Sequence, residues 1–193
     1  MVTNLKPRLT VQEYLAWEAE NEIKHEYIDG EVYAMSGGTG KHSSIIINIT
    51  VAIGQQLGDS VCALHSSEMR VKVAENRYVY PDLSAVCGVE QFEDEGETSL
   101  LNPILVVEVT SPSSIERDRV AKRDLYHEVP SIQGYLVIDQ HRLCTELYIR
   151  ADIGWLLQVY TDPDDVIPLE MLNCELPLAE IYRGIRFEEA GPD

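Results

Sequence analysis

The segment ILVVEV, residues 104–109, is a short apolar run that contains one carboxylate, Glu108. Such a run is typical of a buried strand. A carboxylate inside it has to be hydrogen-bonded, protonated or bound to a cation, because burying an unpaired charge is energetically expensive. A second carboxylate, Asp82, follows Pro81 in another strand-like segment. Two carboxylates that converge on one spot suggest a metal site.

A helix and three more strands are expected after this run. The sequence SPSS, residues 111–114, breaks the strand, and a serine at 113 or 114 can cap a helix over residues 115–128. Val129-Pro130 closes that helix, because the residue before a proline avoids the helical region. The later strands are expected over residues 134–139, 144–150 and 155–160, the last two as an antiparallel extension.

Three elements are expected near the N-terminus. Thr10 is a helix N-cap with a glutamate three residues later, which predicts a helix that ends near Asn21. Asp29-Gly30 between two β-rich runs predicts a hairpin over residues 25–35. Apolar residues at a period close to 3.6 predict a long core helix over residues 42–57.

The remaining segments complete one domain. Strands are expected over residues 61–64, 69–73 and 79–87. Residues 37–42 are expected to form a flexible glycine-rich loop, and residues 90–97 a solvated loop, because their like charges repel. The tail from Pro163 contains a short apolar stretch. The chain shows no internal repeat and no linker, so residues 1–193 are expected to form a single α/β domain with a mixed sheet.

The composition limits the compartments and partners. Fifteen Lys and Arg against 33 Asp and Glu give a net charge of −18, which opposes non-specific attraction to polyanions. The four cysteines show no CxxC spacing and mostly lie in apolar runs, so buried thiols in a reducing cytoplasm are expected rather than disulfides or zinc. No apolar stretch approaches the ~20 residues of a membrane span, so neither a membrane partner nor export is expected.

Several short motifs follow one another in a specific order. They are HEYIDGE (25–31), YPDL (80–83), NP (102–103), VEVTSPS (107–113), Asp118 with Lys122 and Tyr126, and Tyr135 with Asp139. Together they resemble the PD-(D/E)XK nuclease superfamily, and more closely its Uma-type family of restriction endonuclease-like proteins. The resemblance implies a restriction endonuclease-like core in the order αβββαβ, with an N-terminal helix and hairpin and a C-terminal antiparallel extension.

The resemblance also implies a metal-dependent phosphodiesterase site. Asp82 and Glu108 would hold Mg²⁺, for which Mn²⁺ could substitute, and the backbone carbonyl of Val109 would be a third ligand. The metal would polarise the scissile phosphate and lower the pKa of a bound water. The expected activity is endonucleolytic hydrolysis of DNA, and RNA stays open as a substrate.

The chain departs from the superfamily pattern at position 110. The usual Glu-x-Lys motif needs a lysine there, whereas Thr110 shares a strand face with Glu108 but cannot supply a positive charge. The resemblance implies a substitute lysine on the following helix, and the long side chain of Lys122 could reach back to the strand. This ammonium would position the attacking water or neutralise charge that develops on phosphorus.

Each of these residues also has a plain structural interpretation. Asp82 could cap a turn, Glu108 could pair with a basic residue across the sheet, and Lys122 could be an exposed helix residue. Glu31 could reach the site as an additional ligand or be a solvated strand residue. His42 could contact phosphate or orient water, although a hydrogen-bonded histidine at the helix N-terminus is the simpler alternative.

Substrate contacts, oligomeric state and an alternative function complete the expectations. Arg117, Arg119 and Arg123 cluster on one helix and could receive DNA phosphates despite the negative net charge.

Restriction-like enzymes commonly pair subunits, and the strands after Asp139 offer an edge for a homodimer. The alternative function is a catalytically inactive interaction module that retains the nuclease fold, because the large negative charge suits a basic protein partner.

Overall fold

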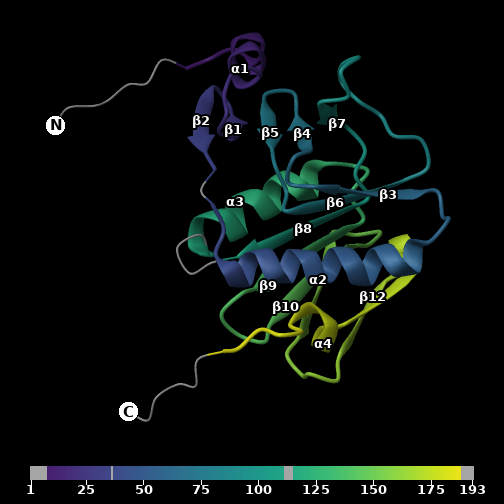
Figure 1. The fold of residues 1–193 in the computed structure, drawn as a ribbon. Helices are drawn as coiled ribbons and strands as arrows, with labels where there is room; N and C mark the ends of the chain where they lie inside the picture. Colours follow the sequence, from purple (N-terminus) through teal and green to yellow (C-terminus); the bar gives the residue numbers. More distant parts are fainter. Residues whose placement is uncertain (1–7, 36, 111–114, 188–193) are drawn as a thin grey trace.

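A six-stranded mixed sheet forms the centre of the molecule (Figure 1). The computed structural model describes residues 8–35, 37–110 and 115–187, of which residues 115–121 are described in backbone only. In spatial order the strands are β11 (Trp155–Tyr160), β10 (Thr145–Arg150), β9 (Gly134–Asp139), β8 (Leu105–Thr110), β6 (Leu83–Cys87) and β3 (Cys62–Ser66). β8 and β9 are parallel, and the other neighbours are antiparallel.

A second, five-stranded sheet lies beyond one edge of the first, above it in Figure 1. Its strands are β2 (Glu31–Ala34), β1 (His25–Ile28), β5 (Arg77–Val79), β4 (Arg70–Ala74) and β7 (Ser99–Leu100). β4 and β7 are parallel, so this sheet is also mixed. The mixed α/β class is confirmed, although the chain forms two large sheets where one was expected.

The strand expected over residues 79–87 is wrong, because the chain changes sheets within it. β5 ends at Val79 in the second sheet, and β6 begins at Leu83 in the central sheet. Pro81 lies between them and has no N–H to donate to a strand ladder, so it interrupts regular pairing. Asp82 therefore lies where the two sheets meet.

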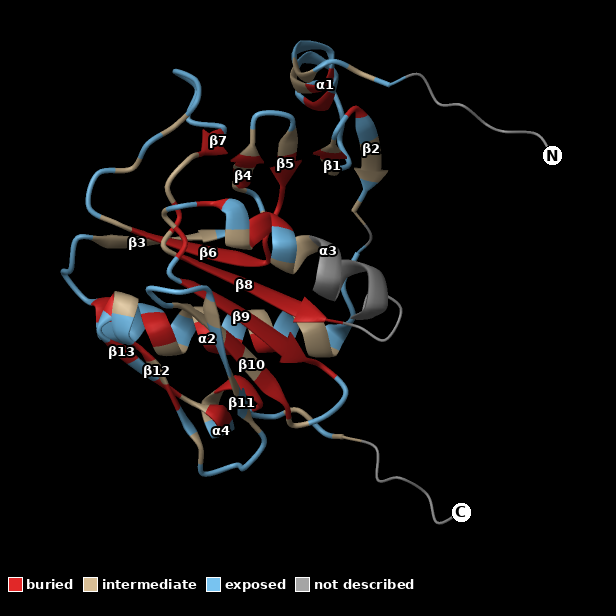
Figure 2. Cartoon of the chain, turned by 180° about the vertical axis from the view of Figure 1, so that it is seen from behind, coloured by how far each residue is buried: buried red, intermediate tan, exposed pale blue. Residues whose placement is uncertain are grey.

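Two long helices cover opposite faces of the central sheet (Figures 1 and 2). Helix α2 (Gly40–Leu57) packs Ile45, Ile49 and Ile53 against β6, β8 and β9. Helix α3 (Ile115–Glu128) contributes Leu125 and Tyr126 to a second core between the two sheets. Along the chain these elements follow one another as α2, β3, β6, β8, α3 and β9, with β10 and β11 added at the end. Among the residues described, no helix is long and apolar enough to cross a membrane.

The N-terminal elements follow their sequence signals. Helix α1 spans Val11–Glu18, three residues shorter than expected, and Thr10 and Glu13 form a capping box at its start. Asp29 and Gly30 both adopt positive φ angles, of 50° and 95°, and join β1 to β2. Positive φ at both turn residues matches the right-handed twist of a two-residue hairpin.

The C-terminal tail is part of the core rather than a short apolar stretch. It forms β12 (Val166–Leu169), the 3-10 helix η1 (Glu170–Leu172), β13 (Cys174–Pro177) and α4 (Leu178–Ile181). Ile167, Leu176 and Ile181 are fully buried in the cluster beneath α2. Asn48 of α2 donates to the carbonyls of Ile181 and Arg183, which joins the tail to the helix.

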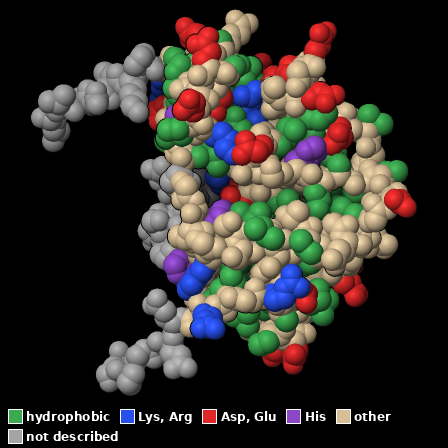
Figure 3. Space-filling model, in the orientation of Figure 1, with side chains coloured by type: hydrophobic (Ala, Val, Ile, Leu, Met, Phe, Trp, Pro, Cys, Tyr) green, Lys and Arg blue, Asp and Glu red, His purple; other side chains and the backbone are tan. Residues whose placement is uncertain are grey.

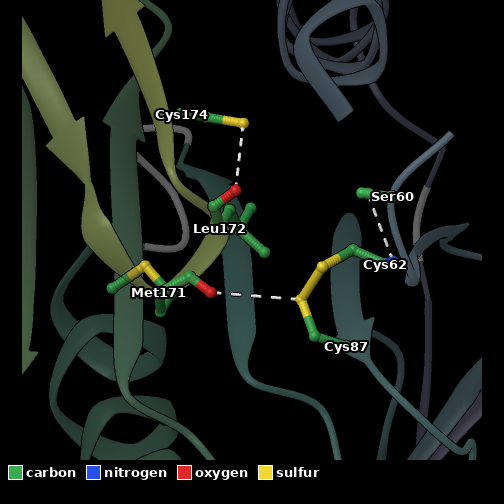
Figure 4. Close-up of a disulfide and its surroundings, with 6 residues drawn as sticks. All are labelled: Ser60, Cys62, Cys87, Met171, Leu172 and Cys174. Carbon is green, nitrogen blue, oxygen red and sulfur yellow. Dashed lines mark hydrogen bonds between the residues drawn. A yellow bond between two sulfur atoms is a disulfide. The ribbon is translucent and has the colours of Figure 1, made fainter. Parts of the chain in front are cut away.

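The expectation that all cysteines are thiols is wrong for two of them. Cys62 of β3 and Cys87 of β6 form a disulfide, and their Cα atoms lie 4.0 Å apart (Figure 4). The two residues are direct neighbours in the antiparallel register, which no spacing along the chain reveals. Cys144 and Cys174 are buried outside this disulfide.

Candidate active site

Asp82 and Glu108 face each other at the end of two paired strands. β6 pairs with β8 in the register Leu83 to Val107, so the next position outward places Asp82 opposite Glu108. Leu83 and Val107 belong to the core beneath α2. Because side chains alternate along a strand, Glu108 points to the opposite face, where it contacts Lys122 and Tyr126 of α3.

The Asp82 carboxylate is fixed by two donors. Its Oδ2 accepts hydrogen bonds from the backbone N–H of Val109, at 2.7 Å, and from Nε2 of His42, at 3.2 Å. Val109 lies beyond the last β6–β8 pair, so its N–H is available to the carboxylate. The N–H and C=O of one strand residue point to the same side. The carbonyl of Val109 therefore also faces the Asp82 side.

The Glu108 carboxylate is buried and carries two hydrogen bonds on one oxygen. Its Oε1 accepts from the ammonium of Lys122 at 3.0 Å and from the hydroxyl of Tyr126 at 2.6 Å. Burial raises the pKa of Glu108 to about 7, because desolvation and the charges of Asp82 and Glu26 outweigh the attraction of Lys122. This acid is therefore poised to gain from a further cation.

Lys122 links the two sheets. Its Nζ lies 3.0 Å from Glu108 in the central sheet and 2.9 Å from Oε1 of Glu26 in β1 of the second sheet. Burial alone would lower the pKa of Lys122, but the two carboxylates overcome that effect and raise it well above its ordinary value. The side chain is a fixed ammonium, not an exposed helix lysine.

Helix geometry explains why α3 can supply both partners of Glu108. Lys122 and Tyr126 are four residues apart and therefore lie on the same helix face. Tyr126 is fully buried, and its ring packs against Tyr135 of β9 at a centroid distance of 5.0 Å. This packing fixes the helix face over the end of β8.

The glycine-rich segment before α2 lies at the same end of the sheet. Thr39 caps α2 and bonds through its hydroxyl to the side chain of Gln140, which donates to the carbonyl of Thr110. A Cβ atom on Gly38 would lie 2.6 Å from Nδ1 of His42, so the bare backbone of Gly38 packs directly on that ring. Figure 3 shows acidic, basic and histidine side chains together in a recess beside one end of α2.

The donor set fits a hard divalent cation. Mg²⁺ usually binds proteins through one or two carboxylates and completes its octahedral shell with waters and substrate phosphate. Asp82, Glu108 and the Val109 carbonyl supply oxygen atoms of that kind. Within the described ranges, no group of three or more His, Cys, Asp or Glu side chains is arranged to hold a metal ion.

The structure gathers some of the predicted residues and separates others. Asp82, Glu108 and Lys122 come together, and His42 contacts Asp82. Glu31 is exposed on β2, where it bonds to Arg8 at 3.3 Å and to Tyr33 at 2.7 Å. Glu31 therefore has the environment of a solvated strand residue. The second sheet does place an acid beside Lys122, but this acid is Glu26, five positions before Glu31.

The expected nucleic-acid contacts are only partly visible. The side chains of Arg117 and Arg119 lie outside the described residues, as do the capping positions 113 and 114. Arg123 donates to Oδ1 of Asp124 at 3.0 and 3.1 Å, so an adjacent acid partly neutralises its charge.

Sequence reasoning missed the roles of Glu26 and Gln140 as neighbours of the site. Strand alternation places Glu26 on the same face as Ile28, which packs on the core beneath α3. The sequence signal that could have identified Glu26 was therefore an acidic residue on the inward face of a predicted hairpin. For Gln140, which follows β9 directly, no comparable signal exists.

Comparison with known proteins places the chain in a family. The model of the Uma2 family, described as "Putative restriction endonuclease", matches residues 11–179. One uncharacterised protein of Synechocystis is 34% identical over 184 residues, with 94% of this chain and 95% of the relative covered. Another from the same organism is 33% identical over 159 residues, with 81% of this chain and 90% of the relative covered.

A solved structure from Anabaena variabilis, described as a putative nuclease belonging to DUF820, shares the fold. Its TM-score to this chain is 0.75 at 21% sequence identity, and the alignment covers 90% of this chain and 97% of that chain. Because the family match spans most of the sequence, the chain belongs to the Uma2 family.

Proposed function

We propose that the chain is a divalent-metal-dependent endonuclease that hydrolyses phosphodiester bonds in DNA. The observation that carries the proposal is the position of Lys122, whose ammonium lies 3.0 Å from Glu108 although it comes from a different element than the usual strand lysine. The element order α2, β3, β6, β8, α3, β9 agrees with a restriction endonuclease-like core. Membership in the Uma2 family supports the same class of activity.

Asp82, Glu108 and the carbonyl of Val109 would hold Mg²⁺ or Mn²⁺. The bound metal would supply Lewis-acid polarisation of the scissile phosphate and a water of lowered pKa. His42 and the N–H of Val109 hold one oxygen of Asp82 in place, and its other oxygen would be the metal ligand. Fixing a ligand in this way limits the reorganisation needed when substrate arrives.

Lys122 would counter the negative charge that develops on the phosphate in the transition state. An ammonium in a buried site acts more strongly than one in water, because the surrounding dielectric is low. Its contact with Glu26 holds it by a second carboxylate besides Glu108. In this arrangement Lys122 takes the role that Thr110 cannot fill.

Plasmid cleavage tests the proposal. Nicking or linearisation of supercoiled DNA should require Mg²⁺ or Mn²⁺ and disappear in Asp82→Ala and Lys122→Ala. The matched control Glu31→Ala removes an exposed acid of the second sheet and should cut like the wild type. An RNA substrate is assayed in parallel, because the site geometry alone does not distinguish the two nucleic acids.

One outcome would favour the acidic interaction module instead. That outcome is a folded wild-type protein that cuts neither DNA nor RNA with either metal and whose melting temperature does not respond to Mg²⁺ or Mn²⁺. In that case the net charge of −18 would favour the binding of a basic protein partner.

A further inference from the structure

β11 is the outermost strand of the central sheet and pairs on one side only. All six of its residues are in register with β10, from Trp155 opposite Arg150 to Tyr160 opposite Thr145. In the part of the chain that the structure describes, no strand lies on its other side. The outward N–H and C=O groups of such an edge are a template for another strand.

β11 lacks the features that normally protect an edge. Natural edge strands carry charged residues, prolines or bulges that prevent pairing with another chain. The sequence WLLQVY, residues 155–160, contains none of these, although the chain as a whole has a net charge of −18. Three large apolar side chains are exposed on the strand, Leu156 at 53%, Leu157 at 46% and Val159 at 54%.

These side chains occupy both faces of the strand. Leu157 lies opposite Tyr148 of β10, which packs on the core beneath α3, and Val159 shares that face. Leu156 lies on the other face with Gln158 and Tyr160. A partner has to cover apolar groups on both faces and also satisfy the strand edge, and an antiparallel strand does both.

We propose that β11 pairs antiparallel with β11 of a second copy of the chain, with Gln158 opposite its own counterpart on a two-fold axis. In this register Leu157 lies opposite Val159 of the second copy, and Leu156 opposite Tyr160. Such apolar cross-strand pairs are the main stabilising unit of an antiparallel ladder. Moving the centre by one residue, to Leu157, would place Leu156 opposite Gln158 instead of Tyr160, so only the centre at Gln158 gives an apolar pair on both faces of the strand.

The strand is already held in the conformation that pairing requires. The Trp155 ring stacks on His127 at 4.2 Å with an interplanar angle of 10°, and the Arg150 guanidinium lies 4.3 Å from its centroid. Arg150 in turn donates to the backbone carbonyls of Val129 and Ile132. A strand ordered before binding loses less conformational entropy when it pairs.

The expected dimer is weak and salt-dependent. One strand pair buries less than the roughly 1,200 Å² at which stable interfaces begin, so it should dissociate on dilution. Each copy carries a net charge of −18, and added salt screens their repulsion. Association should therefore strengthen as the salt concentration rises, which is opposite to the behaviour of nucleic-acid binding.

Cysteine cross-linking tests the register. Under mild oxidation Gln158→Cys should form a covalent dimer, because facing Cα atoms in an antiparallel pair lie within disulfide reach. Leu156→Cys on the same strand should not, since its counterpart would be about 13 Å away along the strands. Absence of the Gln158→Cys dimer, or equal cross-linking of both variants and the wild type, would overturn the proposal.

Sedimentation across a concentration series tests the surface. Leu157→Lys and Val159→Lys should weaken dimerisation about tenfold or more, because each places an unpaired charge in the contact. Val89→Lys is the matched control, since Val89 is 84% exposed and lies outside β11. A wild type that is monomeric at every concentration, or a dimer that survives both lysines, would contradict the proposal. Neither result depends on nuclease activity.

Discussion

Lys122 Nζ lies 2.9 Å from Oε1 of Glu26 and so joins the second sheet to the candidate site. The same ammonium contacts Glu108 of the central sheet at 3.0 Å. One buried cation therefore serves two carboxylates from different sheets. If a divalent cation took Glu108 as a ligand, Glu26 would be the acid that remains to hold Lys122 in position.

Glu26→Gln should reduce cleavage with little effect on folding. The amide keeps the size of the side chain but removes the charge that attracts Lys122, so the ammonium can settle on Glu108 alone. A catalytic group misplaced by about 1 Å can cost on the order of a hundredfold in rate, and we expect a loss of tenfold to a hundredfold. Initial rates of plasmid nicking measure it, with Glu31→Gln as the control. Wild-type rates in Glu26→Gln would show that Lys122 needs no second acid.

Gly38→Ala should impair the site through His42. The added Cβ would lie 2.6 Å from Nδ1 of His42, a distance that forces the ring away from Asp82. We expect cleavage to fall toward the level of His42→Ala while the far-ultraviolet circular dichroism stays unchanged. Gly37→Ala is a close control, because a Cβ there meets nothing within 4 Å. Equal activity of the two alanine variants would contradict a role for the position of His42.

Protonation of His127 should destabilise the fold when the pH falls below about 6.5, the ordinary pKa of a histidine. Burial and the nearby charges of Arg123 and Arg150 lower the pKa of His127 in the folded protein. Its Nε2 is buried with no hydrogen-bond partner among the described residues, so a proton there would be poorly solvated. As the pH falls below about 6.5, the unfolded chain takes up this proton and the folded one resists it, so the free energy of unfolding decreases.

Two measurements check the His127 prediction. The ring signals in a nuclear magnetic resonance titration should give a pKa below 6.5, and His127→Gln should remove part of the loss of stability between neutral and acidic pH. A pKa at or above 6.5 would mean that the ring is protonated without cost against Trp155 and Arg150.

Asn48→Ala should destabilise the attachment of the C-terminal segment. The buried amide donates to the carbonyls of Ile181 and Arg183, at 3.0 and 2.9 Å, and alanine leaves both acceptors without it. A lost buried hydrogen bond costs about 1–3 kcal/mol, so urea unfolding should show a decrease of that order. Gln55→Ala on the exposed face of α2 should change stability by no more than a few tenths.

Local sequence patterns predicted the elements whose formation depends on residues that are close together in the chain. The period of apolar residues located α2, the capping pair at Thr10 and Glu13 located α1, and Asp29-Gly30 located the first hairpin. The apolar run around Glu108 became β8, which is buried along its whole length (Figure 2). In each case a few neighbouring residues contain the signal.

The features that failed depend on contacts between distant segments. The single strand expected through Asp82 is divided between two sheets, because its first part pairs with β1 and β4 and its second part pairs with β3 and β8. Glu26 and Lys122 are 96 positions apart, and only the junction of the sheets brings them together. The C-terminal strands were missed because their short apolar runs become core only by packing under α2.

The disulfide between Cys62 and Cys87 provides the last prediction. It links β3 to β6 and closes a loop with a sequence separation of 25. In the chain-entropy description, closing a loop of this length lowers the entropy of the unfolded chain and so stabilises the fold by about 3.5 kcal/mol. Urea unfolding with and without dithiothreitol should therefore differ by roughly that free energy.

Cys87→Ser should unfold like the reduced wild type and be insensitive to the reductant, because the remaining Cys144 and Cys174 are buried apart from the disulfide. Identical unfolding curves for oxidised and reduced wild type would show that strand pairing alone holds β3 to β6.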